Sequence, residues 1–252
     1  MNFSRELSGI LILWKRELVR YSRARSRVVS SIAMPFFILL FLGTGLNSAF
    51  TVPGGGNYLE FMVPGVIGMV LLFSSIFIGM TVLVDKQFGF LKEILVAPIS
   101  RVSIVLGRAL GGVTIALFQA FIMILAVLFL GVQLSFAQLP LVLLFMFLIS
   151  LGFVSLGIAI ASLMEDIHGF QLVMNFLVMP MFFLSGALFP VEGLPEWLKF
   201  LVILDPLTYG VDGLRGAFGG TSAFPLSFDL AVLACFSLAT VFLGAWLFRK
   251  RS

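Results

Sequence analysis

The chain has 252 residues, of which 60% are hydrophobic and 11% are charged. Soluble domains carry about 25% charged residues, so this composition excludes a soluble globular protein and indicates an integral membrane protein. The formal net charge is +4, but the basic residues cluster at the ends of apolar runs, which is typical of membrane topology rather than nucleic-acid binding. The apolar runs are long and do not alternate, which favours helices over a barrel.

Cysteine usage and the order of segments exclude further classes. Cys235 is the only cysteine and lies in an apolar run, so no disulfide framework and no thiolate metal site is expected. The first long apolar run follows a charged segment, so we expect no cleavable signal peptide. The apolar segments also leave no room for a soluble catalytic domain.

The N-terminal segment, 4–22, has helical periodicity. Apolar residues recur on one face, namely Leu7, Ile10, Leu11, Trp14, Leu18 and Tyr21. Charged residues lie largely on the other face, namely Lys15, Arg16, Glu17 and Arg20. This pattern predicts an amphipathic helix that lies on the membrane surface.

Six apolar segments are each long enough to cross the roughly 30 Å of a hydrocarbon core. They are the segments 28–48, 60–84, 104–130, 141–163, 170–189 and 228–248. The sequence therefore predicts an all-α membrane protein, with one transmembrane domain over 1–252 and six transmembrane helices.

The segment 85–97, D-K-Q-F-G-F-L-K-E-I-L-V-A, lies between the second and third spans. Phe88, Leu91 and Leu95 share a face, which predicts a short amphipathic helix that stops before Pro98. A surface helix joined to two spans can pass a push from a soluble partner into the bilayer. The alternative is an interfacial helix without a partner.

The segment 190–215 precedes the last span and contains two short apolar stretches. Pro195 suits a first helical turn, and Asp205-Pro206 indicates an N-cap followed by the first residue of a helix. Neither helix reaches the roughly 20 residues that a crossing needs. Trp197 and Tyr209 are aromatics of the kind found at headgroup level. We expect a re-entrant helix pair in one leaflet, or alternatively a surface loop with interfacial helices.

The distribution of lysine and arginine predicts the orientation. Of the sixteen lysine and arginine residues, seven lie before the first span, four between the second and third spans and three at the C-terminus. Only Lys199 and Arg215 are left for the opposite side. The positive-inside rule therefore places both termini in the cytoplasm, which requires an even number of crossings. The segment 190–215 then begins and ends on the outer face.

The sequence lacks the motifs of the common catalytic sites. There is no G-x-x-x-x-G-K-[ST] and no H-E-x-x-H, so we expect neither a nucleotide site nor an enzymatic activity on this chain.

Glu165, Asp166 and His168 form a compact polar cluster, which is either a metal or proton site or a solvated turn between spans. One histidine in a short loop favours the turn. No charged residue is expected in the middle of a span, where proton- and ion-coupled carriers need one.

Three amides fall inside the predicted spans, namely Gln119, Gln171 and Asn175. They either form hydrogen bonds between helices or line a transport pathway. Gly107-x-x-x-Gly111 is a candidate for close helix packing, although this pattern is common in glycine-rich spans.

Four motifs carry a resemblance to a known family. They are F-L-S-G-A-L-F-P-V-E-G-L-P-E-W-L-K (183–199), L-D-P-L-T-Y-G-V-D-G-L-R (204–215), E-F-M-V-P-G-V-I-G-M (60–69) and G-F-L-K-E-I-L-V-A-P-I-S-R (89–101). With the order of spans, they resemble the membrane subunit of ABC exporters of the second type. This is the permease family of drug-resistance, polysaccharide-export and nodulation-factor-export systems, and the resemblance covers essentially the whole chain.

The resemblance implies roles for two segments. It makes 85–97 the coupling helix, which docks in a groove of a separate ATPase subunit, and places 4–22 at the same membrane surface. The residues expected to couple are Gln87, Phe88, Phe90, Leu91, Lys92, Glu93 and Ile94. The residues expected in the re-entrant outer gate are Pro190, Pro195, Trp197, Asp205, Pro206, Tyr209, Asp212 and Arg215.

The resemblance also implies an assembly of two permeases, expected to be identical, with two ATPase subunits in the plasma (inner) membrane of a prokaryote. ATP and magnesium would bind the ATPase partner, and no cofactor or metal is expected on this chain. The chain has 29 Phe but only three Tyr and three Trp, which favours a hydrophobic or amphipathic cargo (drug-like, lipid or lipid-linked glycan) over a long sugar chain. The alternatives are an ATP-independent channel or carrier and a membrane scaffold without transport.

Overall fold

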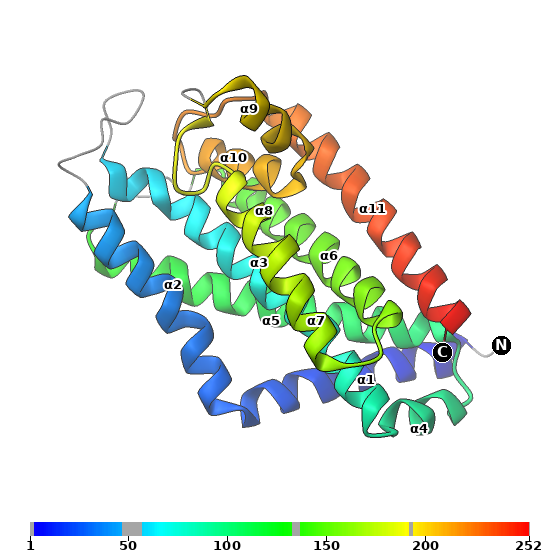
Figure 1. Cartoon of the computed structure of the whole chain (residues 1–252). Helices are drawn as coiled ribbons and strands as arrows, with labels where there is room; N and C mark the ends of the chain where they lie inside the picture. Colours follow the sequence, from blue (N-terminus) through cyan, green and yellow to red (C-terminus); the bar gives the residue numbers. More distant parts are fainter. Residues whose placement is uncertain (1–2, 47–56, 133–136, 192–193, 252) are drawn as a thin grey trace.

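The structure, a computed structural model, describes residues 3–46, 57–132, 137–191 and 194–251, and within these ranges every regular element is a helix (Figure 1). In chain order the elements are α1 (Phe3–Arg23), α2 (Arg25–Gly45), α3 (Tyr58–Gln87), α4 (Phe90–Val96), α5 (Arg101–Phe129), α6 (Leu139–Leu163), α7 (Ile167–Val173), the π-helix η1 (Met174–Val178), α8 (Met179–Leu184), α9 (Glu196–Leu204), α10 (Pro206–Ala217) and α11 (Leu226–Arg251).

Six helical stretches of the described residues are long and apolar enough to cross a membrane. They are Val28–Gly45, Tyr58–Gln87, Arg101–Phe129, Leu139–Leu163, Ile167–Leu184 and Leu226–Phe248. The predicted all-α membrane fold with six spans is thus confirmed. The last residues of the first predicted span, 47 and 48, lie outside the described residues.

Two predicted segments have different bounds in the structure. The fifth span ends at Leu184 rather than at residue 189, because the chain turns after Ser185 and Gly186 adopts a φ of +70°. The helix predicted over 85–97 is shorter, since Asp85 to Gln87 complete α3 and α4 covers only Phe90–Val96. Gly89 separates the two helices with a φ of +80°, a backbone conformation that favours glycine.

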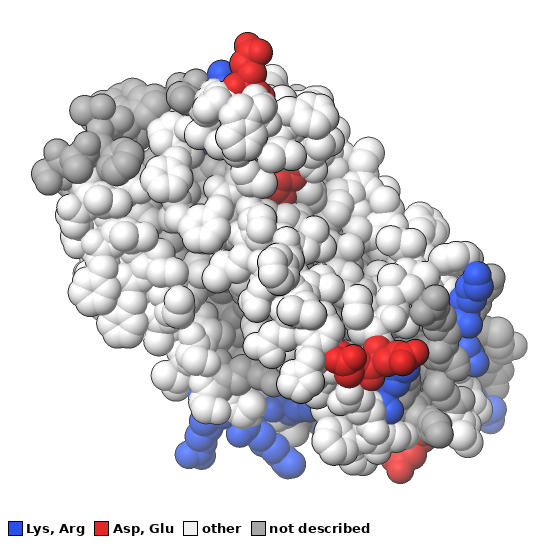
Figure 2. Space-filling model, in the orientation of Figure 1, with Lys and Arg blue, Asp and Glu red and all other residues white. Residues whose placement is uncertain are grey.

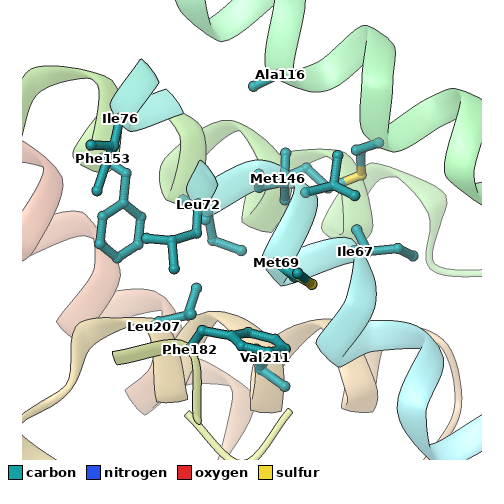
Figure 3. Packing of buried hydrophobic residues seen from close by; sticks show 14 of the residues in the cluster. Ile67, Met69, Leu72, Ile76, Ala116, Met146, Phe153, Phe182, Leu207 and Val211 are labelled. Atoms are coloured by element: carbon teal, nitrogen blue, oxygen red, sulfur yellow. The ribbon is translucent and has the colours of Figure 1, made fainter. Parts of the chain in front are cut away.

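Helix α3 forms the centre of the bundle, with α2, α5, α6 and α10 packed around it. Figure 3 shows Ile67, Met69 and Leu72 of α3 among apolar side chains of the surrounding helices. Those labelled in the same view are Ala116 of α5, Met146 and Phe153 of α6, Phe182 of α8, and Leu207 and Val211 of α10. Because lipid tails are as apolar as these side chains, tight packing rather than exclusion of water must stabilise the contacts.

Small residues allow the closest contacts of this bundle. At the crossing of α3 and α6, a Cβ atom on Gly79 would lie 2.1 Å from the carbonyl oxygen of Gly157. The backbones of α3 and α6 are therefore in direct contact at this crossing, which is the packing that glycine permits in membrane helices.

The fifth span is not a uniform helix. The π-helix η1 interrupts it between α7 and α8, just before Pro180. Proline has no amide hydrogen to donate to the preceding turn, so a change of helical geometry at this place has a local cause. The sequence analysis did not predict this interruption.

The two ends of the bundle differ in charge. Helices α1 and α4 and the C-terminal end of α11 lie together at one end, and α9 and α10 lie at the other (Figure 1). Figure 2 shows Lys and Arg gathered over α1 and near the end of α11, with a broad uncharged face between the two ends. We call the end with α1 and α4 the basic end. Both chain ends lie there, in agreement with an even number of crossings.

The contact at Gly79 gives a test of the fold. We expect Gly79→Ala to destabilise the protein, because the new methyl group meets backbone that cannot move aside. Overpacking of this kind costs about 1–3 kcal/mol. Thermal unfolding of the purified protein in detergent measures the change. Gly45→Ala on α2 is the control, because nothing lies within 4 Å of a Cβ atom placed on Gly45. Equal unfolding temperatures for the two variants would contradict the close contact of α3 with α6.

Candidate functional site

A cleft of about 590 Å³ lies between α1, α2, α3, α5 and α8. Its polar lining consists of Glu17, Arg20, Tyr21, Ser26, Ser30, Ser31, Ser74, Thr81 and Gln119. Its apolar lining consists of Met34, Pro35, Met69, Val70, Phe73, Phe77, Ile78, Ile115 and Met179. Most of the polar residues come from the α1–α2 junction and the last turns of α3, at the basic end. The cleft is therefore amphipathic, with its apolar part farther from the basic end.

Gln119 is the amide that lies in this cleft. It is buried, its Nε2 donates a hydrogen bond to the Tyr21 hydroxyl at 2.7 Å, and its Oε1 accepts one from the Ser74 hydroxyl. Gln171 and Asn175 instead have exposed side chains on α7 and η1. The structure therefore does not bring the three amides together in one pathway, and the hydrogen bonds of Gln119 to α1 and α3 agree with the alternative of hydrogen bonding between helices.

A cluster of charged side chains lies beneath the cleft, where α1, α3 and α5 meet. The buried carboxylate of Asp85 accepts hydrogen bonds from Arg16 at 3.1 and 3.2 Å, from Arg20 at 3.0 Å and from Arg108 at 2.7 Å. Glu17 is also buried, 3.7 Å from the Arg20 Nε and 4.0 Å from the Arg108 Nη1. We call these five residues the ion cluster. Three guanidinium groups and two carboxylates leave it with one net positive charge.

The ion cluster corrects two sequence predictions. Arg16, Glu17 and Arg20 were expected on the face of a surface helix opposite its apolar residues, yet Arg16 and Arg20 pair with Asp85 of α3, and Glu17 is buried beside Arg108 of α5. Leu7 and Leu11 of the apolar face are exposed. Pairing with charged residues of α3 and α5 therefore decides where these side chains of α1 lie, rather than the periodicity of α1 alone.

The second correction concerns Arg108, which the sequence analysis counted with the loop between the second and third spans. It lies inside α5, and its side chain is 0% exposed. Buried charges are stable only when they are paired, so its ion pair with Asp85 is what permits this position.

Helix α4 presents apolar surface at the basic end. Phe88 is 71% exposed and Phe90 is half exposed, and Glu93 is also exposed, whereas Ile94 is partly buried. The backbone of α4 is described throughout, but the side chains of Leu91 and Lys92 lie outside the described residues. Gln87 belongs to α3 and donates from its Nε2 to the carbonyl oxygen of Glu165 at 3.2 Å.

The polar turn between α6 and α7 has a structural role. Asp166 caps α7 by accepting a hydrogen bond from the Gly169 amide at 2.6 Å. In the part of the chain that the structure describes, no group of three or more His, Cys, Asp and Glu residues could hold a metal ion. The geometry therefore favours the interpretation that Glu165, Asp166 and His168 form a turn between spans.

At the opposite end, the predicted N-cap of α10 is confirmed. The Asp205 carboxylate accepts a hydrogen bond from the Leu207 amide at 2.9 Å, and Pro206 is the first residue of the helix. Pro195 immediately precedes α9, and Pro190 lies in the turn before it.

The two aromatic residues expected at headgroup level differ in their exposure. Trp197 is 68% exposed, but Tyr209 is buried and its hydroxyl donates to the carbonyl oxygen of Ile203 at 2.8 Å. Tyr209 also packs against Phe224 and Phe228, with ring centroids 5.5 and 5.7 Å away. Phe224, just before α11, and Phe228 of α11 thus cover the Tyr209 ring, a burial that was not predicted.

Asp212 and Arg215 connect α10 to its surroundings. Asp212 accepts hydrogen bonds from the amides of Ala223 and Phe224, both at 2.9 Å. Arg215 donates to the carbonyl oxygen of Gly186 at 2.9 Å and stacks on the Phe61 ring at 4.1 Å. Burial lowers the pKa of Arg215 to about 10, while Asp212 opposes the shift. The sequence placed these residues in the outer segment but could not predict these contacts.

Comparison with known proteins decides the family. The family described as ABC-2 type transporter matches residues 8–218, which is most of the chain. The chain belongs to the ABC-2 type transporter family.

Several named relatives of this ABC-2 type permease align over nearly the whole chain. The ycf38 protein of Cyanophora paradoxa, a transport permease by name, is 31% identical over 261 residues, covering 97% of this chain and 89% of the relative. Nodulation protein J of Rhizobium meliloti (strain 1021) is 26% identical, with 96% and 93% covered. The inner membrane transport permease YadH of Escherichia coli (strain K12) is 27% identical, with 90% and 89% covered. The predicted family is thus confirmed.

The buried Asp205 gives this ABC-2 type permease a testable pH dependence. Burial raises the pKa of its carboxyl to about 7, against the hydrogen bond from the Leu207 amide, which lowers it. In an unfolded chain the carboxyl titrates near pH 4, so the folded state binds the proton more tightly. The contribution of Asp205 to the free energy of unfolding therefore falls as the pH rises from about 4 to about 7.

We expect Asp205→Asn to flatten the pH dependence of the unfolding temperature in this window, because the amide keeps the capping oxygen and has no charge. Each pKa unit corresponds to about 1.4 kcal/mol, which sets the scale of the change. Asp205→Ala is the control, since it also removes the cap and should be less stable than Asp205→Asn by about 1 kcal/mol at every pH. An unchanged slope in Asp205→Asn would contradict the assignment.

Proposed function

We propose that this chain is the membrane subunit of an ATP-driven exporter that moves a hydrophobic or amphipathic substrate out of the cytoplasm. Membership of the ABC-2 type transporter family supports a transport role, and the amphipathic cleft carries the proposal about the cargo. A lipid, a drug-like amphiphile or a lipid-linked glycan combines the same two kinds of surface that line the cleft.

The basic end is the cytoplasmic end in this proposal. Loops rich in Lys and Arg remain in the cytoplasm, and most of the Lys and Arg residues lie before the first span, in α4 and the helix turns on either side of it, or at the C-terminus. The polar lining of the cleft then lies at the level of the inner-leaflet headgroups. An amphiphile in that leaflet has its polar group at the same depth, so it could enter the cleft without turning over.

The energy must come from a second protein. The sequence has no phosphate-binding loop of the Walker type, and the ion cluster lies near one membrane surface rather than at mid-depth. Helix α4 is the proposed docking element for an ATPase subunit, because its Phe90 and Glu93 are exposed at the cytoplasmic end, together with Phe88 just before it. ATP and magnesium would bind that ATPase, of which we expect two copies.

A second copy of the permease is part of the proposal. Gln171 and Asn175 lie four residues apart, which puts them on one face of the fifth span, and both are exposed in the single chain. Amide groups that face lipid lack hydrogen-bond partners, which is costly in a bilayer. The same face of a second copy could supply partners, and exposed apolar residues such as Phe176 would be covered in the same contact.

Three helices have proposed positions in the bilayer. Leu7, Leu11 and Ile12 give α1 an exposed apolar surface, which suits a helix lying in the inner interface. Helices α9 and α10 are too short to cross, and α10 packs on α3, α6 and α11, so they suit a re-entrant pair supported by protein at the outer end.

The coupling role of α4 gives the test of this function. We expect Glu93→Lys to weaken association with the ATPase, or the stimulation of its ATP hydrolysis, by about tenfold, because rim charges of an interface steer and orient binding. Copurification from membranes and the ATPase rate measure the effect. Glu196→Lys is the matched control, since it makes the same charge change on an exposed residue at the opposite end. Equal behaviour of both variants and the parent would contradict the role of α4.

A further inference from the structure

Three consecutive residues at the end of α3 connect the base of α4 to different parts of the bundle. Asp85 binds the arginines of α1 and α5 in the ion cluster. Lys86 donates from its Nζ to the carbonyl oxygen of Met164 at 3.2 Å, and Gln87 donates to that of Glu165 at the same distance. Only Phe88 and Gly89 separate these contacts from the first residue of α4.

Helices α1 and α5 form one closely packed unit. At one end, the Ser100 amide that begins α5 donates to the Glu6 carboxylate at 3.0 and 3.1 Å. Farther along, the indole of Trp14 donates to the Thr114 hydroxyl at 3.0 Å.

Glycines of α5 bring the two helices close between these hydrogen bonds. A Cβ atom on Gly107 would lie 2.8 Å from the Leu13 Cβ, and one on Gly111 would lie 2.7 Å from the Glu17 Cβ. The pattern Gly107-x-x-x-Gly111 thus supports real close packing, against α1. Hydrogen bonds and close contacts along its length leave α1 little freedom to move apart from α5.

We propose that Asp85 is a positioning residue that makes the α1–α5 unit follow the movement of α4 when the ATPase partner acts on it. The inference rests on the proposed docking of the ATPase on α4. Asp85 lies five residues before the start of α4, and its carboxylate links α3 to α1 and α5. Movement of α4 therefore reaches both helices through one carboxylate.

The link through Asp85 is stronger than the link to the α6–α7 turn. Charge-assisted hydrogen bonds in a region of low dielectric constant are strong, and separation would leave Arg108 buried without its partner. Lys86 and Gln87 bind only backbone oxygens of the turn, and Gln87 is exposed. A push on α4 is therefore expected to move α1 and α5 with α3, while the hydrogen bonds of Lys86 and Gln87 to the α6–α7 turn can break more easily.

The same link reaches the cleft. Arg20 and Glu17 line its polar end, and Arg20 also donates from its Nη2 to the carbonyl oxygen of Thr81, another lining residue, at 3.2 Å. A displacement of α3 relative to α2 must therefore rearrange the polar end of the cleft. Asp85 connects the docking element with the proposed substrate site.

The test removes the two partly exposed guanidinium groups and leaves the buried Asp85–Arg108 pair intact, so that the protein can still fold. The variant is Arg16→Gln with Arg20→Gln, and the matched control is Lys15→Gln with Arg23→Gln, which removes the same charge from exposed positions of α1. In a Cys235→Ser background, spin labels replace Ile12 of α1 and Val96 of α4, which are 67% and 84% exposed. Electron–electron double resonance on the purified permease measures the distance between the labels.

We expect the first variant to broaden the distance distribution and the control to keep it narrow. In liposomes with the ATPase that copurifies, the first variant should transport about tenfold less substrate per ATP hydrolysed, at an unchanged hydrolysis rate. A fold defect would lower all of these quantities together.

Two results would overturn the inference, namely a narrow distribution and full coupling in the first variant, or equal losses in the control. If no ATPase associates with the parent protein, the proposed function fails. The distance measurement on the permease alone then still decides whether Asp85 holds α1 to the α3–α4 junction.

Discussion

The pairing of Asp85 with three guanidinium groups is the interaction on which the basic end of the molecule depends. Arg108 is buried inside a span, and a charge in that position requires a partner within hydrogen-bonding distance. Asp85 supplies this partner and binds α1 with the same carboxylate. The requirement to neutralise one buried charge thereby fixes α1, the base of the cleft and the start of α4 relative to one another.

The sequence predicts those features of the fold that depend on neighbouring residues. The lengths of the apolar runs gave six spans, and the Asp205-Pro206 pair located the start of α10, because both signals are local. The ion cluster could not be predicted in this way, since residues 16, 20, 85 and 108 meet only after the helices pack. The burial of Tyr209 could not be predicted for a similar reason, because the rings that cover it come from residues near the start of α11.

In the candidate site, too, some features depend on neighbouring residues and others on residues that are far apart in the sequence. The residue types at Gln119, Gln171 and Asn175 are alike, and only the packing reveals that Gln119 lies in the cleft while the other two are exposed. The exposed surface of α4 followed from its position between two spans. Its connection to the cleft did not, because it passes through side chains of α1, α3 and α5 that meet only when these helices pack.

The central claim is that a cytoplasmic partner acts on the basic end of this permease through α4. The most direct measurement is the labelling of a single thiol at position 88, made by Phe88→Cys in the Cys235→Ser background, since this residue is 71% exposed. We predict that a membrane-impermeant maleimide fails to label it in intact cells, labels it in inside-out vesicles, and is blocked there when the ATPase is bound. Labelling in intact cells would place α4 outside the cytoplasm and contradict the account.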